Sequence, residues 1–169
     1  YQWSVGGTIL NNSSSFFHSP TTTTTYQLTV TQYGCSATDN VTVTVNDAPN
    51  VGVSGGSSQA ACQGGSLTLS GTGASSYSWD NGVTDGQSFS APGTTTTYTV
   101  TGTDGNGCID TDQINVTVNP NPTVDAGSDM AVCDGTSITL GGSGASTYSW
   151  DNGAVNEVAF NASNTTTYT

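Results

Sequence analysis

The chain has 169 residues and a formal net charge of −12, because twelve acidic residues are offset by no lysine and no arginine. A nucleic-acid binder needs cations that displace counterions from phosphate, so this composition excludes that function. Attraction to anionic lipid is excluded on the same ground. No apolar run approaches the ~18–20 residues of a membrane span, so we also expect no direct membrane insertion.

Roughly a sixth of the residues are Leu, Ile, Val or Phe, and a fraction this low in a strongly charged chain often accompanies disorder. Two features indicate a folded chain instead. Apolar residues alternate with polar ones in short runs, and three Trp and seven Tyr add large apolar surfaces. We therefore expect several thin β-domains, each with a small core.

One motif recurs along the chain. Residues 76–82 (SYSWDNG) return as residues 147–153 (TYSWDNG), and residues 1–3 (YQW) are a shorter copy. A fixed period, here about 72 residues, is the signature of a tandem array. The chain begins and ends inside a repeat, so we expect it to be a section of a longer polypeptide. The expected domains are the C-terminal part of one repeat (1–48), a complete repeat (49–120) and the N-terminal part of a third (121–169).

The first repeat is expected to end in a β-hairpin. Apolar and polar residues alternate in residues 26–30, and this period of two predicts a half-buried strand. The same alternation in residues 41–45 predicts the last strand of the repeat. Residues 33–35 between them predict a turn. Residues 47–50 contain a proline and predict a linker to the next repeat.

The complete repeat predicts about seven short strands, a number typical of an immunoglobulin-like sandwich. Turn signals separate them, such as Asn81–Gly82, whose residues tolerate positive φ. Two packed sheets would hide apolar faces that a lone hairpin leaves exposed. The sequence thus predicts an all-β fold of tandem immunoglobulin-like β-sandwich repeats. The residues expected to point inward are Leu67, Leu69, Tyr98 and Val100. Val51 and Val53 are expected to begin the first strand, Phe89 to lie on a short strand, and Ile114, Val116 and Val118 to form the last strand.

Three motifs that recur in order carry a family resemblance: residues 132–140 (VCDGTSITL), residues 148–153 (YSWDNG), and residues 97–101 with 104–108 (TYTVT, DGNGC). They resemble the immunoglobulin-like and PKD-like tandem repeats of secreted Bacteroidetes cell-surface proteins, which include gliding-motility adhesins exported by type IX secretion. The resemblance covers essentially the whole chain. It implies a very long, exported protein that forms a stalk or filament at the cell surface.

Each repeat carries one early cysteine (Cys62, Cys133) and one cysteine at the late hairpin (Cys35, Cys108). Cysteines in such Thr-, Ser- and Gly-rich β-modules favour an oxidising, extracellular location. Two disulfide schemes are open. We favour a within-repeat bond between Cys62 and Cys108, with Cys35 and Cys133 paired outside residues 1–169. In the alternative, the early cysteine of one repeat joins the late cysteine of the next, because the first turn and last hairpin of a sandwich lie at opposite ends.

Aromatic residues recur where immunoglobulin-like domains bury theirs. We assign them to packing rather than to stacking on sugars, and Tyr hydroxyls in such places bond back to backbone. The predicted core aromatics are Trp3, Trp79, Trp150, Tyr26, Tyr98 and Tyr168.

The late hairpin of the complete repeat is rich in hard oxygen donors. Asp104, Asn106, Asp110 and Asp112 are of the kind that calcium prefers, although their spacing is not that of an EF-hand loop. A solvated turn is the alternative interpretation. Calcium is the one cofactor considered, and none is required by the sequence.

No catalytic constellation is apparent. His18 is the only histidine and has no Ser or Cys partner motif, so general acid–base chemistry lacks an obvious centre. We expect no enzyme but a structural segment of a long extracellular repeat protein, with neighbouring repeats as partners. The alternative is an adhesin module whose sandwich-end loops bind glycans or surface proteins. Loop residues 83–86 and 154–157 differ, but the repeats are otherwise much alike, which favours a spacer.

Overall fold

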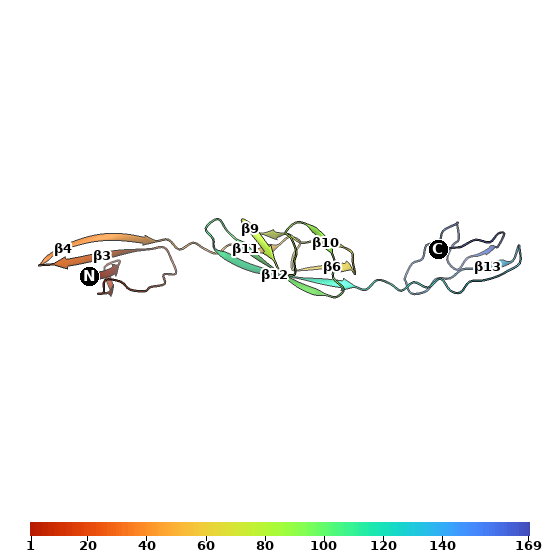
Figure 1. Cartoon of the computed structure of the whole chain (residues 1–169), viewed down its shortest axis with the longest axis horizontal. Helices are drawn as coiled ribbons and strands as arrows, with labels where there is room; N and C mark the ends of the chain where they lie inside the picture. The colour runs from red at the N-terminus through yellow and green to blue at the C-terminus, as the bar shows by residue number, and fades with distance from the viewer.

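The computed structural model describes the whole chain, residues 1–169, with fourteen strands and no helix. The predicted all-β fold is therefore confirmed. Three units follow one another along the long axis of the molecule and are joined by extended linkers (Figure 1). We call them unit 1 (1–48), unit 2 (49–120) and unit 3 (121–169). The structure has no helix that could cross a membrane.

Unit 1 is one antiparallel sheet with the strand order β2 (Thr8–Asn11), β1 (Gln2–Val5), β3 (Thr24–Gln32) and β4 (Cys35–Val43). β3 and β4 form the predicted hairpin, but β4 begins at Cys35 and ends at Val43 rather than covering residues 41–45. Tyr33 and Gly34 turn the chain with φ of 52° and 84°. Two positive φ values match the twist of the flanking strands. Cys35, expected in the turn, instead begins β4.

Unit 2 places a four-stranded sheet opposite two short two-stranded sheets. β6 runs parallel to β12, while the other pairs are antiparallel. The large sheet has the order β6 (Ser58–Cys62), β12 (Ile109–Asn119), β11 (Thr96–Thr103) and β9 (Ser76–Trp79). The small sheets pair β5 (Gly52–Val53) with β8 (Gly71–Thr72), and β7 (Ser66–Thr68) with β10 (Ser88–Ser90).

The core of unit 2 draws on both the large sheet and the short ones. Because successive strand residues point to opposite faces, the period-two patterns of β11 and β12 place one apolar row inward. Full burial of each large side chain stabilises the unit by roughly 1.5–3 kcal/mol, so this core dominates its stability. The cluster consists of Val51, Val53, Leu67, Leu69, Trp79, Tyr98, Val100, Ile114 and Val116.

The sequence did not predict β6 as a strand. Its apolar residues are the small Ala60 and Ala61, so the local pattern is weak. The strand forms because Ser58–Cys62 pairs in parallel with Asn115–Asn119, more than fifty residues along the chain. Parallel pairing needs a long crossover and leaves no local turn signal.

Unit 3 contains β13 (Ser137–Thr139) and β14 (Ala159–Asn161), whose Ile138–Phe160 register matches Leu67–Phe89 in unit 2. The Tyr148 hydroxyl donates to the Ala145 carbonyl at 2.5 Å, and the Tyr77 hydroxyl donates to the Ala74 carbonyl at 2.8 Å. These shared contacts favour the tandem-repeat prediction.

Candidate functional site: unit junctions and open grooves

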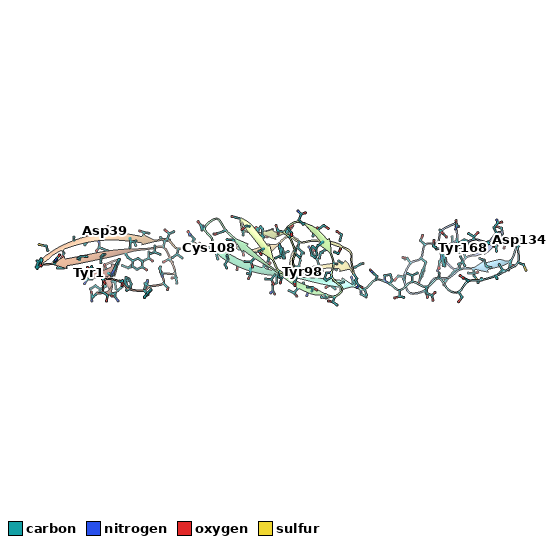
Figure 2. All side chains as sticks on the ribbon, viewed as in Figure 1. Tyr1, Asp39, Tyr98, Cys108, Asp134 and Tyr168 are labelled. Atoms are coloured by element: carbon teal, nitrogen blue, oxygen red, sulfur yellow. The ribbon has the colours of Figure 1, made fainter.

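The linkers on either side of unit 2 contact the unit itself. At the first junction, the Cys108 thiol lies 3.8 Å from the Asn46 carbonyl of unit 1 (Cys108 is labelled in Figure 2). At the second, the Asn121 side chain donates to the Gln63 carbonyl at 3.3 Å, and the Gln63 amide donates to the Asn119 carbonyl at 2.9 Å. One cysteine-bearing turn therefore stands at each end of unit 2.

The predicted Cys62–Cys108 disulfide is wrong for this structure. All four cysteines are free. Cys62 is level with Asn119 at the end of β12, whereas Cys108 precedes Ile109 at its start. At ~3.3 Å per residue the two lie on the order of 30 Å apart, and a disulfide needs Cα atoms within ~6 Å. The alternative, between neighbouring repeats, stays a prediction, as does a partner for Cys35 and Cys133 outside residues 1–169.

The acidic hairpin at residues 104–108 is stabilised by hydrogen bonds within its own turn. Asp104 Oδ1 accepts the amides of Asn106 at 2.8 Å and Cys108 at 2.9 Å. Desolvation raises the pKa of the Asp104 carboxyl, but the hydrogen bonds from Cys108, Asn106 and Gly107 outweigh it and lower the pKa. The carboxylate thus acts as the cap of its own turn.

The four predicted calcium ligands do not converge. Asp110 Oδ2 accepts the Val51 amide at 3.3 Å, and Asp112 stands opposite Val100 in the strand ladder, away from the hairpin tip. No group of three or more His, Cys, Asp or Glu side chains is arranged to hold a metal ion. Asp104 and Asn106 remain together as a solvated turn, so the structure does not favour calcium there.

The predicted core aromatics are packed to different degrees. Tyr26, Tyr98 and Trp79 are buried, whereas Trp3, Trp150 and Tyr168 are half-buried. Burial raises the pKa of the Tyr98 phenol, with a smaller contribution from the nearby Asp80 carboxylate. Each of the three predicted core tyrosines packs edge to face against a phenylalanine, with ring centres 5.3–6.1 Å apart. The pairs are Tyr26 with Phe16, Tyr98 with Phe89, and Tyr168 with Phe160.

The hydrogen-bond partner of each tryptophan indole was not predicted from the sequence. Trp79 Nε1 donates to Asp85 Oδ1 at 2.9 Å, and Trp150 Nε1 donates to Asn156 Oδ1 at 3.1 Å. The sequence signal that could have identified this partner is an Asp or Asn six positions after the Trp, as in units 2 and 3. Unit 1 has Ile9 at that spacing, and Trp3 Nε1 is buried without an acceptor.

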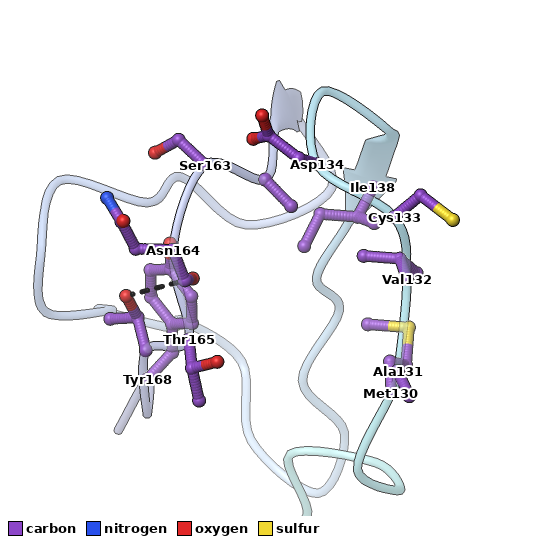
Figure 3. A pocket seen from close by; sticks show the side chains of 12 residues that line it. Met130, Ala131, Val132, Cys133, Asp134, Ile138, Ser163, Asn164, Thr165 and Tyr168 are labelled. Atoms are coloured by element: carbon purple, nitrogen blue, oxygen red, sulfur yellow. Dashed lines mark hydrogen bonds between the residues drawn. The ribbon is translucent and has the colours of Figure 1, made fainter.

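Units 1 and 3 each have an open groove. In unit 1, a cavity of about 260 Å³ is lined by Trp3, Phe16, Tyr26, Val41 and Val43, among others. In unit 3, a cavity of about 490 Å³ separates residues 130–134 from residues 162–168 (Figure 3). In unit 2 the counterparts of Val41 and Val43 are Ile114 and Val116, which are fully buried.

The comparison with known proteins gives no family assignment. No protein-family model matches the chain, and no curated protein matches it.

Proposed function

We propose that the chain is a structural segment of a long extracellular repeat protein, which spaces other parts of a stalk or filament from the cell surface. The observation that carries this proposal is the linear order of the units in Figure 1. The chain enters unit 2 beside Cys108 and leaves it beside Cys62, at the opposite end of β12. A unit with its two linkers at opposite ends adds its full length to an array.

The linkers support extension. Pro49 lies in the first, and Pro120 and Pro122 lie in the second. Each proline fixes its own φ and biases the preceding residue toward extended backbone. The hydrogen bonds at the ends of unit 2 add contacts between linker and unit. The resemblance to exported surface repeats supports an extracellular location.

The adhesin alternative is less well supported. Its main sequence argument was the difference between loop residues 83–86 and 154–157. Those loops contain Asp85 and Asn156, which make the same internal hydrogen bonds to Trp79 and Trp150. The difference therefore falls on residues with a shared structural role, and no loop shows a feature that selects a glycan or protein.

Small-angle X-ray scattering of dilute monomer tests the spacer proposal. A compact chain of this length has a radius of gyration of ~15 Å. We expect a clearly larger value and a rod-like scattering profile. A radius close to the compact value would overturn the proposal. Antibody labelling of intact cells tests the location, and labelling only after lysis would contradict it.

A further inference from the structure

Unit 2 has a closed core, yet one edge of its large sheet has no partner strand. β6 is the outermost strand there and pairs only with β12. The Asn115 amide donates to the Ser57 carbonyl at 3.0 Å, and the Gln63 amide donates to the Asn119 carbonyl at 2.9 Å. Main-chain groups of successive strand residues point to opposite sides of the strand. The odd-numbered residues of β6 therefore bond to β12, and the even-numbered residues face away from it.

The even-numbered residues of β6 present main-chain groups to solvent. Ser58, Ala60 and Cys62 are all exposed, and the amides and carbonyls of Ser58 and Ala60 point to the side that has no strand. The Cys62 carbonyl accepts the Gly65 amide at 2.9 Å, but the Cys62 amide also lies on the open side. Such a row of donors and acceptors is a template for another strand.

The β6 edge lacks the features that keep natural sheet edges apart. Those features are charged side chains, prolines, and bulges that twist the strand away. β6 reads SQAAC, so it has no charge and no proline, and its register with β12 is unbroken. Its side chains are small, which lets another backbone approach closely. The counterpart of Ser58 in unit 3 is Asp129, so this uncharged edge is a property of unit 2.

The distribution of charge indicates which partner fits this edge. The chain has a net charge of −12, so two copies repel each other where their acidic residues face. Residues 48–79 and 113–124 contain no acidic residue, and they include β6 and the part of β12 that pairs with it. A second copy can therefore approach at this edge with the least repulsion, and it presents the same open donors and acceptors.

We propose that β6 of unit 2 pairs antiparallel with β6 of a second copy, so that the two large sheets become one. With Ala60 opposite Ala60 of the other copy, Ser58 lies opposite Cys62, and each pair exchanges main-chain hydrogen bonds. A two-fold axis at Ala60 relates the copies, so the same patch is used on both and the contact closes at a dimer. Strand addition gains its affinity from these main-chain bonds.

The dimer sets the two chains in opposite directions. β6 and β12 run along the long axis of the molecule (Figure 1), so antiparallel strands mean antiparallel chains. Stalks that project from two facing surfaces meet in this orientation, whereas neighbours on one surface point the same way. The contact thus joins facing surfaces, a consequence that rests on the proposed stalk. The pairing itself goes beyond the spacer function, which needs only the units of one chain.

Sedimentation and amide hydrogen exchange of the 169-residue polypeptide, in dilute and in concentrated solution, test the pairing. With the thiols kept reduced, we expect the mass to rise from 17.0 kDa toward twice that value as the concentration increases. The Ser58 and Ala60 amides should gain protection in the dimer, because they face the open edge. The Gln59 and Ala61 amides bond to β12 and should be protected in both states. A monomer at every concentration, or a dimer without protection at Ser58 and Ala60, would overturn the proposal.

Two variants at Ala60 separate edge pairing from other contacts. Ala60→Pro removes a donor that faces the open edge and spares the bonds to β12, so we expect loss of the dimer with unit 2 still folded. Ala60→Asp places two carboxylates opposite each other across the two-fold axis and should also give a monomer. Thr117→Asp is the matched control, because Thr117 lies beside Ala60 one strand in from the edge, and it should keep the dimer. A dimer that survives both Ala60 variants would contradict edge pairing.

The distance between the two Cys108 residues of a dimer tests its orientation. In a Cys35→Ser/Cys62→Ser/Cys133→Ser variant, each copy carries one spin label, at Cys108. Cys108 lies nine residues before Thr117, so antiparallel pairing places the two labels about 60 Å apart. Parallel pairing would place them about 15 Å apart, across three strand spacings. The short distance would overturn the antiparallel dimer, while an elongated chain that stays monomeric would overturn the pairing and leave the spacer function standing.

Discussion

The indole nitrogen of Trp79 donates a hydrogen bond of 2.9 Å to Asp85 Oδ1. The same oxygen accepts the Gly71 amide at 2.7 Å, so one acceptor ties β9 to β8. In unit 3, Asn156 Oδ1 accepts from Trp150 and from the Gly142 amide in the same way. A carboxamide can therefore replace the carboxylate, and the oxygen matters more than the charge.

We expect Asp85→Ala to lower the free energy of unfolding of unit 2 by about 1–3 kcal/mol, because it leaves the Trp79 donor without a partner. Asp85→Asn is the matched control and should retain most of the stability, since unit 3 uses Asn at this place. Urea denaturation measures both. Equal losses in the two variants would contradict a role for the acceptor oxygen.

Gly71 is expected to resist substitution for a steric reason. A Cβ on Gly71 would overlap the ring of Tyr77, and the same relation holds between Gly142 and Tyr148. Gly71→Ala should cost about 1–3 kcal/mol, as overpacking does. At Gly105 a Cβ would meet nothing within 4 Å, so Gly105→Ala should stay within about 0.5 kcal/mol of the parent. Thermal unfolding of the two variants compares them, and similar midpoints would refute the steric account.

The Asp104 hairpin should weaken in acid. Hydrogen bonds from the Cys108 and Asn106 amides hold the pKa of Asp104 below its ordinary 3.8 in the folded protein, although desolvation opposes them. A lowered folded pKa contributes stability that is present above the unfolded pKa and is lost as the pH falls through the folded pKa. The protection factor of the Cys108 amide, which is its exchange rate relative to the intrinsic rate at the same pH, should therefore fall below about pH 4.

Asp104→Asn is the control for this titration. It keeps an oxygen acceptor but cannot titrate, so the protection factor of the Cys108 amide should depend less on pH in the acid range. Exchange with the same pH profile in both proteins would show that a different group governs the hairpin.

Equivalent core positions should differ in energy between units. Ile114 is 0 % exposed and Val41, its counterpart, is 49 % exposed. We expect Ile114→Ala to cost about 2–5 kcal/mol, as large core deletions do. Val41→Ala should cost under about 1 kcal/mol in dilute monomer, because its side chain is half in water. Comparable losses measured by denaturation would mean that the groove of unit 1 is closed.

Local patterns predicted the hairpins well. The alternation around Tyr26 and Val41 became β3 and β4, and Asn81–Gly82 turns the chain with φ of 52° and 75°. These features depend on neighbours in sequence, which a single chain displays directly. The sequence also identified Leu67, Leu69 and Val100 as inward residues, and all three are buried.

Long-range pairing was the part that local patterns could not predict. β6 pairs with a strand more than fifty residues away, and this pairing carries Cys62 to the far end of the unit from Cys108. The disulfide prediction failed for that reason.

The role of Asp85 was missed because its partner Trp79 lies across a loop rather than on the same strand.

The distance between Cys35 and Cys133 tests the extended arrangement most directly. Cys35 begins β4 of unit 1, and Asp134, next to Cys133, lies at the far end of unit 3 in Figure 2. In a Cys62→Ser/Cys108→Ser variant, Cys35 and Cys133 can be labelled with a donor and an acceptor dye. Resonance energy transfer between the two dyes is then measured on single molecules, with a dye pair whose transfer is efficient over the diameter of a compact domain. We predict almost no energy transfer, because β4 and β12 alone span about 65 Å end to end. Efficient transfer would mean that units 1 and 3 fold back on each other, and would contradict the spacer function.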